Sequence, residues 1–251
     1  MKKLLCTVFM ICSLSSVALF AAKEKVTAKE VYESDGSSLK EFFTGSKKYI
    51  EFDDVKLRTS TVLDSLKARE ATLIYNPRSK AAGVSTYFET MFYNFLFDEE
   101  ARNLIQKGFE QYKKDFEEKS LIRKASSKTT KMYGSAKVYA EFGTIKTMMS
   151  HYANSVFNVG YRFYKNTPFF VLSIESAKDE WSDAEEETRW VMPTVTLYFT
   201  LAQGELFSTD MSTDVLKIYQ DEFDQFVNSD LDEEKNENKK YNKKDDDLDI
   251  Y

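Results

Sequence analysis

Few residues in this sequence are suited to catalysis. His151 is its only histidine, and its two cysteines, Cys6 and Cys12, both lie within the first 22 residues. A serine-histidine-aspartate triad would have to use His151, yet no G-x-S-x-G motif supplies the nucleophile. The zinc motif H-E-x-x-H and the glycine-rich phosphate loops are absent as well. We therefore predict neither a metal nor a cofactor, and we interpret His151 as an ordinary surface histidine in a loop with no acidic partner nearby in sequence.

Three glutamates keep one catalytic class open. Glu89, Glu141 and Glu175 stand among aromatic residues of predicted strands. Glycosidase-like hydrolysis needs two carboxylates roughly 5–10 Å apart, and burial would raise the pKa of one of them, as a general acid requires. The alternative, which we favour, is that these glutamates face outward or pair with Arg162 or Lys137 across the sheet.

Tyrosine, tryptophan and arginine offer a better lead to function. Alternating residue types predict a four-strand antiparallel meander at 131–143, 156–164, 169–175 and 188–201. Its outward face carries the residue types that anchor interfaces, because they combine a large contact area with a polar group. The residues predicted for binding are Tyr139, Arg162, Tyr164, Phe169, Trp190 and Tyr198. The last helix of the chain either covers this face or leaves it free, and the sequence leaves both arrangements open.

Two helices are predicted to accompany the sheet. Asp98 is a favourable N-cap, and the residues after it place apolar side chains on one face of a helix over about 98–121. Small residues in 131–143 would let this helix approach the sheet closely. A second helix is predicted over about 212–228. With shorter strands at 48–52 and 71–76, this order indicates an α+β fold with a largely antiparallel sheet.

One loop predicts a strand register. Residues 165–168 separate two strands of the meander, and a loop of this length would pair Tyr164 with Phe169 and Phe163 with Phe170. A slip by one residue would exchange the apolar and polar faces, so the pattern favours this pairing.

The most aromatic stretch of the chain is residues 85–97, STYFETMFYNFLF. Its apolar pairs suit an amphipathic helix, whereas its threonine, tyrosine and phenylalanine residues favour a strand. Because Asp98 caps a new helix, we interpret the stretch as a central strand covered on both faces. A strand of this length would span about 43 Å, so we expect a bend or an early end.

Both ends of the chain differ from this middle part. Residues 1–22 join a basic start, an apolar run and small residues, the pattern of a secretory signal peptide that is cleaved near Ala21 or Ala22. Residues 23–38 are predicted to be a weakly ordered lead-in, residues 39–228 a single domain, and residues 229–251 a disordered charged tail. The mature chain would be periplasmic or secreted, without cysteines and without a transmembrane segment.

The net charge and the absent motifs together restrict the possible functions. Removing Lys2 and Lys3 with the signal peptide changes the formal charge from −6 to −8. A negative chain argues against nucleic acid as a partner and against a membrane protein held by electrostatics. We predict an exported, non-catalytic binding protein that uses the aromatic sheet face or an apolar pocket between sheet and helices. A carrier of an apolar, lipid-like ligand and a carboxylate-dependent hydrolase are the alternatives.

Overall fold

The computed structural model describes residues 25–34, 47–60, 66–88, 90–123, 131–144, 150–180 and 184–246 of the chain. Side chains are described up to Leu231, with Phe88 excepted. The predicted signal peptide and Glu89 lie outside these stretches, so neither prediction is tested by the fold.

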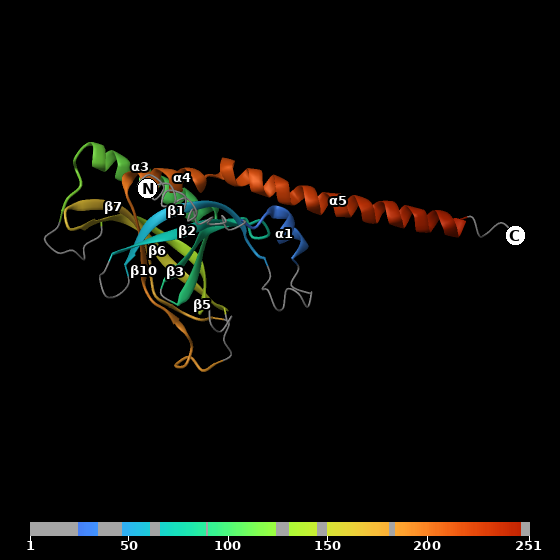
Figure 1. Cartoon of the computed structure of the whole chain (residues 1–251), viewed down its shortest axis with the longest axis horizontal. Helices are drawn as coiled ribbons and strands as arrows, with labels where there is room; N and C mark the ends of the chain where they lie inside the picture. The colour runs from blue at the N-terminus through green and yellow to red at the C-terminus, as the bar shows by residue number, and fades with distance from the viewer. Residues whose placement is uncertain are drawn as a thin grey trace, which may run out of the picture.

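Eight antiparallel strands close into a barrel (Figure 1). They are β1 (Ile50–Ser60), β2 (Lys67–Asn76), β3 (Ala81–Phe88), β4 (Met91–Phe97), β5 (Lys131–Thr144), β6 (Ser150–Tyr164), β7 (Thr167–Ile174) and β10 (Val195–Phe199). Around the barrel the order is β1-β10-β7-β6-β5-β4-β3-β2, which confirms the four-strand meander and the α+β class. The predicted antiparallel sheet is closed and not an open meander, because the end of β1 pairs with β10, Arg58 opposite Tyr198, and joins the two edges.

Two very short strands lie outside the barrel sheet. β8 (Ala177–Lys178) and β9 (Val191–Met192) pair with each other as a separate two-stranded sheet. The strand predicted over 188–201 is therefore broken at Pro193, which has no N–H to donate to a ladder.

The barrel interior is a packed apolar core. Residues from all eight strands belong to one contiguous cluster, as expected when the inward faces of the strands meet inside a closed barrel. Ring contacts also join strands that do not pair with each other, as between Phe97 of β4 and Phe157 of β6, whose centroids are 4.9 Å apart. The fully buried phenylalanines of the strands are Phe95, Phe97, Phe142, Phe157, Phe170 and Phe199. Because these rings expose no surface that a water molecule could touch, no ligand-sized void adjoins them.

Helix α3 (Glu99–Glu117) lies across one end of the barrel and confirms the helix predicted from Asp98. The Asp98 carboxylate accepts a hydrogen bond from the backbone N–H of Ala101 at 2.8 Å. Small residues allow the close approach that the sequence predicts, since a Cβ at Gly134 would lie 2.6 Å from the side chain of Leu104. The helix thus closes the apolar core at this end of the barrel.

Helix α4 (Leu201–Asp210) lies beside α3 and is an element that the sequence analysis missed. Its signal was present, because Thr200 and Gln203 form a reciprocal capping box at its start. Phe207 stacks on Phe199 of β10 with centroids 4.7 Å apart, so α4 also closes the core.

The aromatic stretch 85–97 forms two strands and not one. β3 and β4 are a hairpin in which Phe88 pairs with Met91. The interpretation as strand is confirmed, and the expected early end is a reversal of the chain. β4 places Tyr93, Phe95 and Phe97 in the core, whereas Tyr87 of β3 is exposed on the outside of the barrel.

The predicted register of the β6–β7 hairpin is wrong by two residues. Tyr164 pairs with Thr167 and Arg162 with Phe169, so the turn has two residues, Lys165 and Asn166. Lys165 adopts a positive φ of 56°, which suits the tight turns of twisted hairpins. A shift of two residues leaves every side chain on its predicted face.

Helices α1 (Ala28–Glu33) and α5 (Thr213–Asp246) pack against each other. Tyr32 contacts the rings of Phe223 and Phe226 and donates a hydrogen bond to Asp230. α1 lies in the segment predicted to be weakly ordered, where its buried residue Val31 joins the core.

α5 extends beyond the predicted helix 212–228 into the predicted tail and projects away from the barrel (Figure 1). Residues 229–246 contain neither glycine nor proline, so no residue there forces the helix to end. Among the described helices, none is long and apolar enough to cross a membrane.

Candidate functional site

The six predicted binding residues fall in three separate places. Four of them meet on the outer face of β6, β7 and β10, where Phe169 and Tyr198 pack with Val171 and are joined by Tyr164. Arg162 donates a hydrogen bond to the Tyr198 hydroxyl at 3.0 Å and lies over its ring. We call these five residues the outer aromatic cluster.

The outer aromatic cluster is covered by its neighbours. Leu66 packs against it, Arg58 lies over the Phe169 ring, and Ser60 donates to the Tyr198 hydroxyl at 3.2 Å. In the described part of the chain, α5 packs instead against α1 and α4. Phe169 and Tyr198 are consequently buried, and their rings are not available to a partner.

Tyr139 lies elsewhere, beside a buried carboxylate on the outer face of β5. It stacks on Tyr152 of β6 with ring centroids 6.0 Å apart. Next to this pair, Glu141 accepts hydrogen bonds from Lys48 at 3.1 Å, Tyr152 at 3.2 Å and Tyr49 at 2.5 Å. Asn94 of β4 adds a fourth at 3.2 Å. The group ties the segment before β1 to the opposite wall of the barrel.

The expectation that burial raises the pKa of such a glutamate is wrong for Glu141. Burial alone would raise that pKa, but the charge of Lys48 and the hydrogen bonds from Tyr49 and Asn94 outweigh it. The pKa of Glu141 therefore lies below its ordinary value, and the pKa of Lys48 lies above its own. Both groups are held charged, which suits a structural ion pair and not a proton donor.

Trp190 is the third location, beside His151 at the start of β6 and thus at the opposite end of that strand from the β6–β7 turn. Its indole is 49% exposed and stacks on the imidazole of His151, with centroids 4.9 Å apart and planes inclined by 23°. Phe142 lies near His151 as well, 5.5 Å between ring centroids. Nδ1 of His151 is 2.7 Å from a carboxylate oxygen of Asp179. Since a carboxylate only accepts, Nδ1 carries the hydrogen.

The prediction for His151 is therefore wrong on two points. The residue lies in the strand β6 and not in a loop, and it is buried and not on the surface, with an acidic partner that is distant in sequence. Asp179 follows 28 positions later and reaches β6 because the chain after β7 continues alongside that strand, where the backbone N–H groups of Glu180 and Glu175 bond to Tyr152 and Val156. Sequence proximity could not reveal this pair. The acidic residues that precede Trp190 in the sequence, Asp179 among them, were the signal from which an acidic partner could have been suspected.

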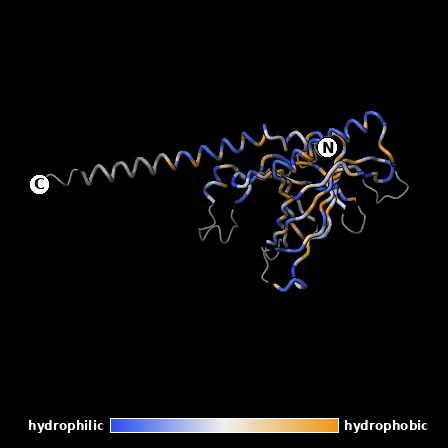
Figure 2. Tube along the Cα trace, turned by 180° about the vertical axis from the view of Figure 1, so that it is seen from behind, coloured by the Kyte–Doolittle hydropathy of each residue, from blue (hydrophilic) through white to orange (hydrophobic). Residues whose placement is uncertain are grey.

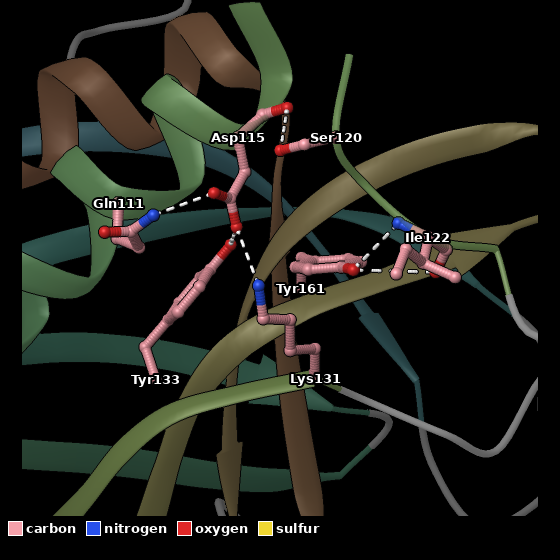
Figure 3. Close-up of polar contacts among 7 residues, drawn as sticks. All are labelled: Gln111, Asp115, Ser120, Ile122, Lys131, Tyr133 and Tyr161. Carbon is pink, nitrogen blue, oxygen red and sulfur yellow. Dashed lines mark hydrogen bonds and ion pairs between the residues drawn. The ribbon is translucent and has the colours of Figure 1, made fainter. Parts of the chain in front are cut away.

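A second buried carboxylate lies where α3 meets β5 (Figure 3). Asp115 accepts hydrogen bonds from Gln111 at 2.7 Å, from Lys131 at 3.1 Å and from Tyr133 at 2.9 Å. Ser120 bonds to its backbone carbonyl. Burial raises the pKa of Asp115, but these donors outweigh burial and lower it overall. The cluster fixes the last turn of α3 to the first residues of β5.

Replacing Tyr133 with phenylalanine is expected to reduce the free energy of unfolding by about 1.5 kcal/mol at pH 7, because one hydrogen bond to a buried charge is lost. A lowered pKa stabilises the fold above the ordinary pKa of Asp, and this contribution disappears as the pH falls through the folded-state pKa. The difference between wild type and variant should thus shrink at about pH 3, close to the ordinary Asp pKa. Urea unfolding at both pH values measures it.

Tyr164→Phe is the matched control for this experiment. The Tyr164 ring packs on the outer aromatic cluster and under Lys165, and among the described residues its hydroxyl has no hydrogen-bond partner. An equal loss of stability in the two variants would show that the Asp115 contact contributes nothing specific.

The three glutamates do not assemble into a cleft in the described structure. Glu141 is buried in its ion pair, whereas Glu175 is exposed and accepts a hydrogen bond from Asn158 at 3.0 Å. Glu89 lies outside the described residues. Across those described, no group of three or more histidine, cysteine, aspartate or glutamate side chains is arranged to hold a metal ion.

Comparison with known proteins supplies the family. The chain belongs to a family described as an uncharacterised Treponema protein. The match covers residues 28–218, which include α1, all eight barrel strands, Trp190 and the first turn of α5. No curated protein and no solved structure matches the chain. The barrel with its capping helices is therefore the part that defines the family, and the projecting part of α5 lies outside the match.

Proposed function

We propose that this protein is an exported, non-catalytic binding protein that contacts its partner through Trp190. The observation that carries the proposal is a half-exposed indole held in place by stacking on a buried, hydrogen-bonded histidine. Such a side chain loses little freedom when a partner covers it, which is a property of residues that dominate binding energy. Of the six residues predicted for binding, Trp190 is the one whose side chain is exposed.

The surroundings of Trp190 support the same conclusion. Val191 is 52% exposed next to it, and the backbone carbonyl of Trp190 accepts a hydrogen bond from Asp179 at 2.8 Å. One aspartate thus holds both the backbone of Trp190 and the imidazole beneath its ring. A fixed aromatic surface with an apolar neighbour suits a protein partner better than a small polar ligand.

The two alternative functions have less support. A carrier of an apolar ligand needs an internal cavity, and the barrel interior is filled by phenylalanine side chains. A carboxylate-dependent hydrolase needs a glutamate with a raised pKa, whereas the pKa of Glu141 is lowered.

Trp190→Ala is expected to reduce retention of the partner at least tenfold, because a central aromatic residue of an interface contributes about 2 kcal/mol or more. Native mass spectrometry of the protein purified from its own organism measures the mass and amount of what is bound. Tyr87→Ala is the matched control, since Tyr87 is an equally exposed aromatic residue, 52%, on β3.

Equal loss from both variants would overturn the role of Trp190. Copurification of a lipid that survives Trp190→Ala would favour the carrier function instead. Retention of the same partner by both variants would also contradict the proposal.

A further inference from the structure

A run of basic residues lies between Glu118 and Glu141. These 22 residues include six basic side chains and no acidic one, in a chain whose formal charge is −6. The six are Lys119, Arg123, Lys124, Lys128, Lys131 and Lys137. The run starts just after α3 and continues into β5, so its first residues lie at the end of the barrel that α3 covers.

Contacts bring the start of this run beside the β6–β7 turn. The backbone N–H of Ile122 donates to the Tyr161 hydroxyl at 3.0 Å, and Arg123 donates to Asn166 in the turn. Lys165, the other turn residue, is exposed and adds a further cation. We call the resulting surface the basic corner, and define it as Lys119, Ile122, Arg123 and Lys165.

Apolar side chains stand exposed beside these charges. Ile122 exposes 69% of its surface, and Met132 and Phe116 nearby expose 51% and 39%. Figure 2 shows the hydrophobic segment after α3 between hydrophilic neighbours. An exposed isoleucine flanked by cations is the composition with which peripheral proteins enter the headgroup region of a membrane.

The basic corner keeps a positive charge when the neighbouring acidic residues are taken into account. Lys131 is committed to buried Asp115, and Glu117 and Glu118 at the end of α3 reduce the local potential. Arg123 bonds to a neutral amide and Lys165 lies over the Tyr164 ring, and within the part of the chain that the structure describes neither forms an ion pair with a carboxylate.

We propose that the basic corner docks on an anionic phospholipid surface, with Ile122 entering the headgroup region. The overall negative charge does not prevent this, because salt limits electrostatic interaction to about 8 Å and the local charge decides. Each basic residue near such a surface strengthens binding about fivefold.

The rest of the charge distribution would orient the protein. Residues 213–234 of α5 carry eight acidic residues and one lysine. This helix projects on the side of the barrel away from the corner (Figure 1). An anionic surface would attract the corner and repel the acidic residues 213–234, whereas residues 235–246 at the projecting end of α5 carry five lysines and three acidic residues. The proposal is independent of the function of Trp190, which lies at the other end of the barrel.

Vesicle co-sedimentation of the mature chain tests the proposal. We expect binding to vesicles that contain phosphatidylglycerol, weak binding to pure phosphatidylcholine, and loss of binding as salt rises. The variant Arg123→Gln/Lys165→Asn should bind about 25-fold more weakly, since two cations are removed. Asparagine tolerates the positive φ at position 165.

Two further variants test whether vesicle binding depends on the basic corner itself or on the net charge or the Trp190 surface. Lys56→Gln/Lys67→Gln removes the same charge from exposed positions of β1 and β2 and should bind vesicles as wild type does. Trp190→Ala should also bind normally. Ile122→Ser should weaken binding without changing its salt dependence.

Three results would overturn the proposal. They are equal binding to both kinds of vesicle, equal weakening by the two double variants, and loss of vesicle binding on addition of inorganic phosphate at constant ionic strength. The last would assign the corner to a free anion. Circular dichroism of each variant confirms that the fold is retained.

Discussion

Replacing Gly83 with alanine should lower the free energy of unfolding by about 3 kcal/mol or more, because the new methyl group would collide with backbone. A Cβ at this position would lie 1.7 Å from the carbonyl oxygen of Phe95 and 2.7 Å from its carbonyl carbon. A flexible side chain could move aside, but these atoms belong to the paired strand β4. The collision therefore separates the two strands at the point where Gly83 pairs with Leu96.

Chemical denaturation with fluorescence detection measures this effect. Ser85→Ala is the control, since Ser85 lies two residues further along β3, on the same face and half-buried, and pairs with Asn94. We expect less than about 0.5 kcal/mol there, as for a substitution that makes no new contact. A Gly83→Ala protein as stable as wild type would mean that the β3–β4 pairing can relax at this position.

Replacing Lys48 with methionine should cost about 2 to 3 kcal/mol at pH 8, because it leaves the buried carboxylate of Glu141 without its cation. The cost is smaller than for a fully buried pair, since Lys48 is itself 41% exposed and partly screened by water. Tyr49, Asn94 and Tyr152 still donate to the carboxylate and limit the loss.

The pH dependence distinguishes this explanation from a simple loss of packing. In the wild type the pKa of Glu141 is lowered, so its stabilising contribution is present above the ordinary glutamate pKa and disappears as the pH falls through the folded-state pKa. In the variant the uncompensated carboxyl group should have a raised pKa and be neutral at low pH. The difference in stability between the two proteins should thus be large at pH 8 and small below about pH 4.

Lys137→Met provides the comparison for this experiment, because Lys137 is an exposed lysine of β5 outside the Glu141 group. It should leave the unfolding free energy nearly unchanged at both pH values. A difference between wild type and Lys48→Met that does not vary with pH would show that the loss comes from packing and not from charge.

Local sequence patterns were sufficient to predict several helices and strands of this protein. Asp98 and the apolar face after it located α3, because an N-cap and a helical period act within a few residues. Alternation located β5, β6 and β7 for a similar reason, and it placed Arg162, Phe169 and Tyr198 on one face. Interface-forming residue types also singled out Trp190, although nothing in the sequence ranked it above the other five.

Contacts between distant residues were decided by the tertiary structure alone. The pairing of Arg58 with Tyr198 closes the barrel across 140 positions of sequence, and no local pattern encodes whether two sheet edges meet. The same closure buried the outer aromatic cluster under Leu66 and turned its rings from a binding surface into packing.

The candidate site, too, depends partly on local sequence and partly on tertiary contacts. Tryptophan at position 190 is visible in the sequence, but its support by His151 depends on Asp179 lying beside β6. Hydrophobic period and capping are properties of neighbouring residues, so one sequence suffices to read them. Burial, ion pairing and the direction of a pKa shift depend on which distant side chains meet, and those meetings exist only once the barrel has closed.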